Sequence, residues 1–273
     1  MVAAVSNAGL EPSSPLELPS AMKIEEQVAR ELADWSLANA RFSAFSSTSA
    51  AFDATYFEEL FGFPPETQTT RKAQFLSEFS TTREQTVYQL VVAGPKIDVI
   101  ISAGLQVGEV PKAFPVLQEA VQVRVELRRV AASLIGRVPE VRRLAVGEQT
   151  LMPAASRIEA YKALARFLPS IKIDAENSSD FFYRINRPRI VDFNGQKRVI
   201  NRLSQWGCLQ LNVTVTASEV SKTVVSGEAV SLITDVNSTA EDDLSALTSE
   251  EKVKITDKLF AFSAELSEKG DHP

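Results

Sequence analysis

Four of the five arginines between residues 181 and 206 have the spacing that could bind an anion. Asn194-Gly195 is a strong signal for a two-residue hairpin turn, which would place Arg187 opposite Arg202. Side chains alternate between the two faces of a strand. We therefore expect one face to carry Arg187, Arg189, Arg198 and Arg202, and the other to carry Asn186, Ile190, Val199 and Leu203. Guanidinium groups bind carboxylates and phosphates through planar, paired hydrogen bonds, so the predicted chemistry is recognition of an anion or an acidic partner.

Four cations on one face of a hairpin require a counter-charge, because like charges opposite each other destabilise strand pairing. One source is internal: carboxylates of this chain, such as those of Glu250, Glu251 or Asp257, would lie over the arginines. The other source is external, and would be a phosphate, a nucleic acid or an acidic protein. A merely solvated face is the third alternative. The candidate anion- or partner-binding residues are therefore Arg187, Arg189, Arg198, Arg202, Asn186 and Asn201.

Other residues of the hairpin bear on the same choice. Aromatic side chains at its open end fit core packing better than stacking on nucleic-acid bases; these are Phe181, Phe182, Tyr183 and Trp206. Pro188 interrupts the first strand, and a proline in a strand belongs at a sheet edge or a bulge. An exposed edge could accept an added strand from a protein partner.

The residue types needed for most catalytic and metal sites are scarce in this chain. Its one histidine is His272, beside the carboxy-terminus, and its one cysteine is Cys208. A catalytic triad needs a rigidly held histidine, and a zinc site needs several histidine or cysteine ligands. Residues 93–96 lack the spacing of a phosphate-binding loop. We expect no enzymatic activity, no metal and no cofactor; carboxylate-dependent phosphoryl chemistry with a recruited metal is the enzymatic alternative.

Basic residues are concentrated in the middle of a chain whose formal net charge is −6. Residues 121–210 contain 16 lysines and arginines against 8 aspartates and glutamates, whereas both flanking segments are acidic. A second basic group lies in and after an expected long helix: Arg124, Arg128, Arg129, Arg137, Arg142 and Arg143. This distribution predicts either internal charge complementarity or a footprint for a phosphate-bearing partner.

Hydrophobic periodicity predicts an α+β fold, with one or more antiparallel sheets and packed helices. Helical spacing is seen over 51–61, 115–135, 157–168 and from 249 onward. Strand patterns occupy 37–45, 85–92, 97–102, 141–151, 181–193, 197–208, 209–216 and 229–236. The element order suggests two β-α-β-β-α halves in tandem, 23–136 and 137–269, which pack as one domain or as two. We expect a disordered tail at 1–22 and a short tail at 270–273.

Part of the arginine hairpin resembles a known group of proteins. Residues 178–189 and 200–206 read SSDFFYRINRPR and INRLSQW. They resemble a loosely defined group of sporadically distributed, uncharacterised prokaryotic proteins of about this length. The resemblance implies a prokaryotic, cytoplasmic α+β protein, and it brings no catalytic residue and no substrate.

Composition and the hairpin together lead to an expected function. The sequence has no apolar run of transmembrane length and no secretory signal, and a single cysteine fits a reducing cytoplasm. We expect a cytoplasmic, non-enzymatic interaction protein that binds a protein partner and no membrane. The alternative is binding of nucleic acid or a phosphate ligand through the basic middle segment.

Overall fold

A computed structural model describes residues 32, 35–48, 52–104, 111, 113–217 and 220–270, and for 213–217 and 220–226 the backbone alone. The strands are β1 (Ser36–Ser46), β2 (Thr67–Arg71), β3 (Leu76–Arg83), β4 (Thr86–Ala93), β5 (Lys96–Ala103), β6 (Val141–Ala154), β7 (Phe182–Asn186), β8 (Arg189–Phe193), β9 (Gln196–Ala217) and β10 (Val220–Ser238). The helices are α2 (Ala54–Phe61), α3 (Ala120–Ile135), α4 (Arg157–Phe167) and α5 (Ser249–Lys269), with a 3-10 turn at Lys72–Gln74. The predicted α+β class is confirmed. The tail expected at 1–22 lies outside the described residues.

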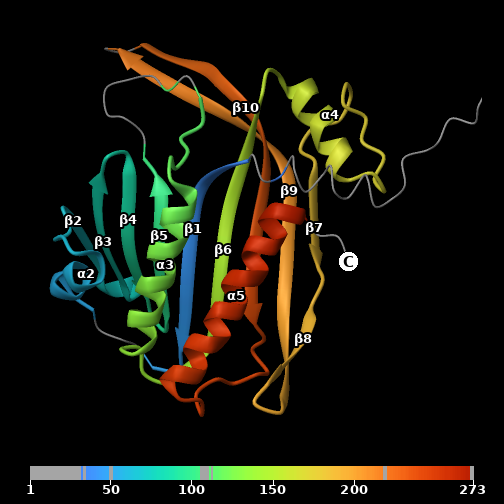
Figure 1. Ribbon diagram of the computed structural model, residues 1–273. Coiled ribbons are helices and arrows are strands. Elements are labelled where there is room, and N and C mark those ends of the chain that lie inside the picture. Colours follow the sequence, from blue (N-terminus) through green and yellow to red (C-terminus); the bar gives the residue numbers. More distant parts are fainter. Residues whose placement is uncertain are drawn as a thin grey trace, which may run out of the picture.

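The strands form a single antiparallel sheet in the order β2-β3-β4-β5-β1-β6-β10-β9-β7, and β8 also pairs with β9 (Figure 1). β1 and β6 lie side by side near its centre, so the segments 23–136 and 137–269 share one sheet. Each segment supplies a strand, a helix, four strands and a second helix in the described part of the chain. Because four strands, and not two, lie between the helices of each segment, the expected tandem of β-α-β-β-α units is not seen.

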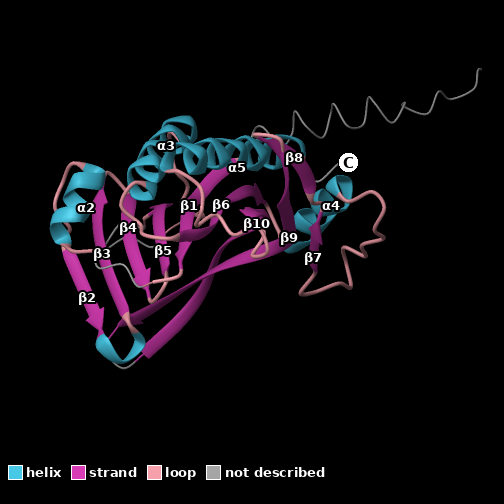
Figure 2. Ribbon diagram, turned by 90° about the horizontal axis from the view of Figure 1, so that it is seen from below, coloured by secondary structure: helices cyan, strands magenta, loops and turns pink. Residues whose placement is uncertain are grey.

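One face of the sheet is apolar and covered by helices. Phe42 of β1 lies opposite Val99 and Val146, and Val146 lies opposite Val236. These side chains are fully buried and belong to one core cluster with residues of α2, α3 and α5. Further along the same face, Trp206 and its cross-strand partner Leu232 pack against α4. Because cross-strand partners share a face, every described helix lies on this side, and the opposite face carries none of them (Figure 2).

Side-chain caps mark the start of α2, α4 and α5. The Ser156 hydroxyl accepts from the Glu159 amide at the start of α4. α5 is capped by Thr248 in a capping box with Glu251, one residue before the predicted start at Ser249. α2 ends at Gly62, whose φ of 82° is the left-handed conformation that glycine adopts readily.

Within the described residues, no helix has the length and apolar composition needed to cross a membrane.

β9 and β10 extend well beyond the rest of the sheet. β9 pairs with β7 as far as Gly207, and β10 pairs with β6 from Glu228 onward. Past these residues the two strands pair with each other up to Ala217 and Val220, and no other described strand joins them. The result is a two-stranded ribbon that projects from the sheet (Figure 1).

Candidate functional site

The arginine hairpin has the predicted register. Arg189 lies opposite Ile200 and Ile190 opposite Val199, and the Arg187 amide donates to the Arg202 carbonyl at 3.0 Å. Asn194 and Gly195 have φ values of 53° and 78°, as a hairpin turn of this type requires. Pro188 separates β7 from β8 at the edge of the sheet, which confirms its predicted position.

The face that carries the four arginines is turned toward α5. Arg202 is 3% exposed and lies opposite Val236 of the main core. The Arg189 guanidinium donates to both oxygens of Glu265 at 2.8 Å, and Arg202 Nη2 lies 3.4 Å from Glu265 Oε1. Both guanidinium groups also lie over the ring of Phe262, at 5.4 and 5.5 Å from its centroid. One turn of α5 therefore supplies a carboxylate and an aromatic face to two arginines.

Arg198 has a carboxylate of its own. Its side chain is 12% exposed, and its Nη1 lies 3.9 Å from Asp242 Oδ1. The other oxygen of Asp242 accepts from the Val199 amide at 2.9 Å, which fixes the carboxylate beside the strand. The counter-charge is thus internal for these arginines, and Glu265 and Asp242 supply it in place of the carboxylates suggested by the sequence. Those form other contacts: Glu251 with Asn194, Asp257 with Arg128 and Glu250 with Lys254.

The aromatic residues of the hairpin divide between the core and the surface. Trp206 is 1% exposed and packs edge-on against Trp35 and in a stacked arrangement with Phe167. Phe181 and Tyr183 are partly buried against the same cluster. Phe182 is 62% exposed. Core packing, the interpretation preferred from the sequence, is confirmed for all but Phe182.

The second basic group is also engaged within the chain. Four of its arginines form ion pairs: Arg124 with Glu148 at 2.7 Å, Arg128 with Asp257 at 3.6 Å, Arg137 with Glu59 at 3.1 Å and Arg142 with Asp243 at 3.9 Å. The other two donate to neutral groups, Arg129 to the Leu60 carbonyl at 2.6 Å and Arg143 to Asn237 at 2.8 Å. Two of these four carboxylates, Asp243 and Asp257, belong to the acidic carboxy-terminal segment. The uneven charge distribution therefore reflects internal complementarity at these positions.

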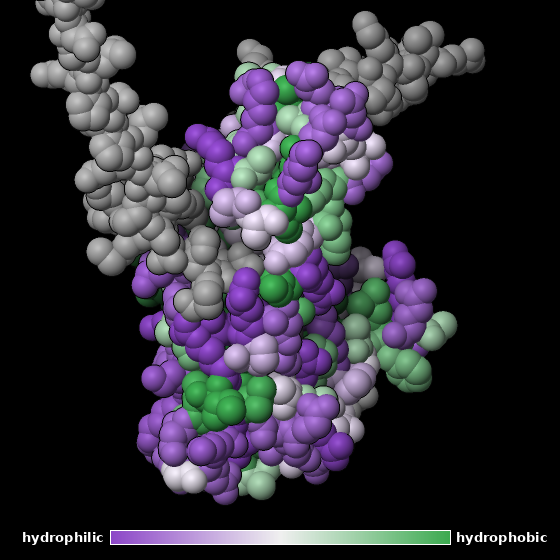
Figure 3. Space-filling model, turned by 90° about the vertical axis from the view of Figure 1, so that its right-hand side faces the viewer, coloured by the Kyte–Doolittle hydropathy of each residue, from purple (hydrophilic) through white to green (hydrophobic). Residues whose placement is uncertain are grey.

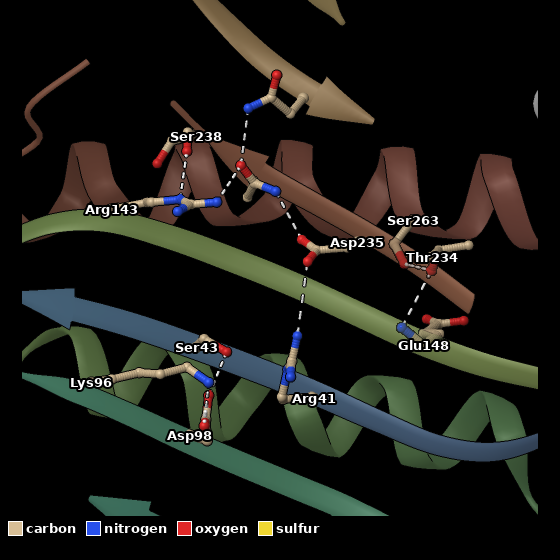
Figure 4. Close-up of polar contacts among 12 residues, drawn as sticks. Arg41, Ser43, Lys96, Asp98, Arg143, Glu148, Thr234, Asp235, Ser238 and Ser263 are labelled. Atoms are coloured by element: carbon tan, nitrogen blue, oxygen red, sulfur yellow. Dashed lines mark hydrogen bonds and ion pairs between the residues drawn. The ribbon is translucent and has the colours of Figure 1, made fainter. Parts of the chain in front are cut away.

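Arg124 and Glu148 form the most buried of these pairs. Glu148 is 3% exposed and accepts from Arg124 and, at 3.0 Å, from the Ser267 hydroxyl of α5. The Thr234 hydroxyl accepts from the Glu148 amide at 3.2 Å, and it lies beside Ser263 (Figure 4). Burial lowers the pKa of Arg124, but the hydrogen bond and charge of Glu148 outweigh it, so the pKa is raised overall. This polar cluster joins α3 and α5 to β6.

Asn186 and Asn201 lie on the opposite, helix-free face and begin a chain of side-chain contacts. The Asn186 amide donates to Asn201 at 2.9 Å, and Asn201 donates to Asn237 at 3.1 Å. Asn237 in turn donates to Asp235 at 2.8 Å, and Asp235 faces Arg41 of β1 at 3.9 Å (Figure 4). This open-face network runs across four strands, β7, β9, β10 and β1.

A hollow of about 440 Å³ lies on this same open face. Arg41 and Ile100 line it together with residues of β4, β6 and β10. Sequence reasoning missed this hollow, because its residues come from strands whose order is set by tertiary structure. Among the described residues, no group of three or more histidine, cysteine, aspartate or glutamate side chains is placed to hold a metal ion.

The sequence was compared with models of protein families and with curated proteins. No model of a protein family matches the sequence, and no curated protein matches it.

Proposed function

We propose that this protein is a non-enzymatic interaction protein that binds a protein partner at the sheet edge formed by β7 and β8. The observation that carries the proposal is a set of apolar side chains exposed on one face of this edge. Phe182, Ile190 and Val199 are 62%, 70% and 37% exposed. Their register places them on the same face as Asn186 and Asn201. Apolar anchors beside polar groups are the usual composition of a protein interface.

The backbone of the edge supports the same proposal. β7 and β8 each pair with β9 on one side, and no further strand among the described residues pairs with their outer side. An extended segment of a partner can add to such an edge through main-chain hydrogen bonds. Figure 3 views this side of the molecule, where small hydrophobic patches interrupt a largely hydrophilic surface.

The other edge of the sheet fits a partner less well. β2 has the sequence TQTTR, and all five of its residues are exposed. The strand itself offers unpaired backbone groups but no large apolar side chain, and Phe75, which is 77% exposed, lies in the turn beyond its end and not along the edge. We therefore assign binding to the β7–β8 edge.

Partner capture with edge variants tests this proposal. The full chain and its Ile190→Asp and Val199→Asp variants would be used as bait in lysate, with bound proteins identified by mass spectrometry. The matched control is Val121→Asp on α3, because Val121 is 75% exposed and lies on a helix away from this edge. We expect the same protein to be captured by the parent and the control and lost from both edge variants. Equal capture by all four folded proteins would contradict the proposal.

Nucleic-acid or phosphate binding is the competing proposal, and it rests on the basic middle segment. Engagement of Arg189, Arg198 and Arg202 with Glu265 and Asp242 removes much of the charge it would use. We expect no salt-sensitive retention of the protein on heparin or DNA. Retention at low salt that weakens in Arg184→Ala, at an exposed position of β7, would favour this alternative.

A further inference from the structure

We propose that the hollow on the open face of the sheet is a binding site for a small monocarboxylate, with Arg41 as the residue that binds the carboxylate. This site is separate from the β7–β8 edge, since it lies over β4, β5, β1, β6 and β10. Its volume of about 440 Å³ falls in the range of small-molecule sites, roughly 300–1,000 Å³.

The guanidinium of Arg41 is the charged group that the hollow offers to a ligand. Its side chain is 37% exposed. Within the described residues its one ion pair is with Asp235, at 3.9 Å, which is long for a hydrogen-bonded pair. By contrast, Arg189 makes two bonds of 2.8 Å to Glu265. Arg41 therefore keeps donors available for a planar, bidentate anion.

Gly147 creates the space in which Arg41 lies. It is directly opposite Arg41 in the β1–β6 register. A Cβ at residue 147 would be 3.6 Å from Arg41 Nη2 and 3.1 Å from the Thr234 carbonyl oxygen. A Cβ there would press on the Thr234 carbonyl oxygen and would already touch the guanidinium, so a larger side chain would enter the space in which Arg41 lies.

Amide groups at the rim of the hollow are already held in place. Asn39 donates to Gln149 at 2.9 Å, and Gln149 donates to Ser231 at 3.2 Å. Gln89, on the other side of Arg41, donates to Glu78 at 3.0 Å. These bonds fix the orientation of the amides and leave the carbonyl oxygens of Asn39 and Gln89 to accept from polar groups of a ligand.

The remaining surroundings indicate the class of ligand. Ile100 and Ile233 line the hollow and provide apolar contact for a hydrocarbon body. Asp235 beside Arg41 and Glu78 beside Gln89 add negative charge. A doubly charged phosphate would be repelled by these carboxylates more strongly than a singly charged carboxylate. The hollow therefore fits a singly charged carboxylate with a hydrocarbon body better than a phosphate.

Titration of the ¹⁵N-labelled full chain with hexanoate and benzoate tests this site. Hexanamide and benzamide serve as uncharged counterparts, and methyl phosphate as the dianionic probe. We expect saturable shifts of the Arg41 Nε–H and of the Asn39 and Gln149 amides with at least one carboxylate. The matching amide should bind about tenfold or more weakly, as the loss of a charge-assisted hydrogen bond implies.

Variants separate binding at Arg41 from general effects. Arg41→Gln, and Gly147→Val with a side chain large enough to enter the space of the guanidinium, should each weaken carboxylate binding about tenfold or more while the melting temperature shows that the protein is folded. Arg71→Gln, at an exposed position of β2, is the matched control and should bind as the parent does. The proposal is overturned if no carboxylate shifts these signals, if amides or methyl phosphate bind as tightly, or if Arg41→Gln binds like the parent. Ile190→Asp should leave this titration unchanged, so partner capture and carboxylate binding fail independently.

Discussion

At the scale of single residues, buried charges in this protein are held by specific partners. Glu148 is nearly inaccessible to solvent, and three groups from α3, α5 and β10 bond to it or to its amide. Removing one member of a buried ion pair leaves the other uncompensated, whereas replacing both with apolar residues often costs little. The Arg124–Glu148 pair allows a direct comparison of these two cases.

We expect Glu148→Met to lower the free energy of unfolding by about 2–4 kcal/mol. This loss is smaller than for a fully buried ion pair, because the Arg124 side chain is 27% exposed. Arg124→Met in the same chain should recover more than half of this loss. Urea denaturation measures both values. Glu59→Met is the control, since its pair with Arg137 is exposed and should contribute at most about 1 kcal/mol. A double variant as unstable as the single one would contradict this account.

Cys208 gives a second test at this scale. Burial, and then the charge of Glu228, raise the pKa of its thiol from 9.0 to about 11. At neutral pH, the fraction of Cys208 present as the reactive thiolate is therefore roughly 100-fold smaller than for a cysteine with a pKa of 9.0. We expect slow alkylation by iodoacetamide at pH 7.5, with a rate that rises until about pH 11 in the folded protein. Rapid labelling that levels off near pH 9 would show that the thiol is not buried in this way.

At the scale of elements, the docking of α5 depends on the arginine face of the hairpin. Glu265 and Phe262 are three residues apart, so they lie on one side of the helix. There they meet Arg189 and Arg202 together. This contact explains why a hairpin face that carries Arg189 and Arg202 can lie next to the core.

We expect Glu265→Gln to lower the free energy of unfolding by about 2–4 kcal/mol, because Arg202 is 3% exposed and the charge of Glu265 beside it would be removed. Glu250→Gln is the matched control on the same helix. Its pair with Lys254 is exposed and follows i, i+4 spacing, so its loss should leave the free energy of unfolding nearly unchanged. Chemical denaturation of the two variants measures the difference. Equal stabilities would mean that the arginine face does not depend on Glu265.

Elements with local signals could be predicted from the sequence, and elements set by distant contacts could not. The register of the arginine hairpin follows from Asn194-Gly195 alone. By contrast, β2 contains no apolar residue and was not predicted, because its pairing with β3 determines it. The helix expected from residue 115 begins at Ala120, since Leu117 is buried and its amide donates to the Leu37 carbonyl.

The candidate sites show the same division. Asn186 and Asn201 face each other within one hairpin, so they could be predicted to lie together. Arg41, Gly147 and Asp235 come from three strands far apart in sequence. Their meeting on one row depends on the order β1-β6-β10. Local periodicity shows that each segment is a strand but carries no information about its neighbours.

At the scale of the whole molecule, the shared sheet predicts a single cooperative unit. Residues 1–136 alone would leave β1 without β6, and residues 137–273 alone would leave β6 without β1. Both fragments would also expose core residues that the two segments bury jointly. We expect the full chain to unfold in one transition by calorimetry and circular dichroism, and neither fragment to fold alone. Two separate transitions, or a folded fragment, would contradict this expectation.

The projecting ribbon of β9 and β10 has a mechanical consequence. The same two strands continue into the sheet, where β10 pairs with β6 over ten residues, from Glu228 to Asn237. A force applied to the ribbon along its length would load these hydrogen bonds in shear, all at once, instead of opening them one after another. The two strands of the ribbon would therefore resist being pulled out of the sheet. Tension applied to the ribbon would be transmitted to the centre of the sheet, including the strands beneath α5.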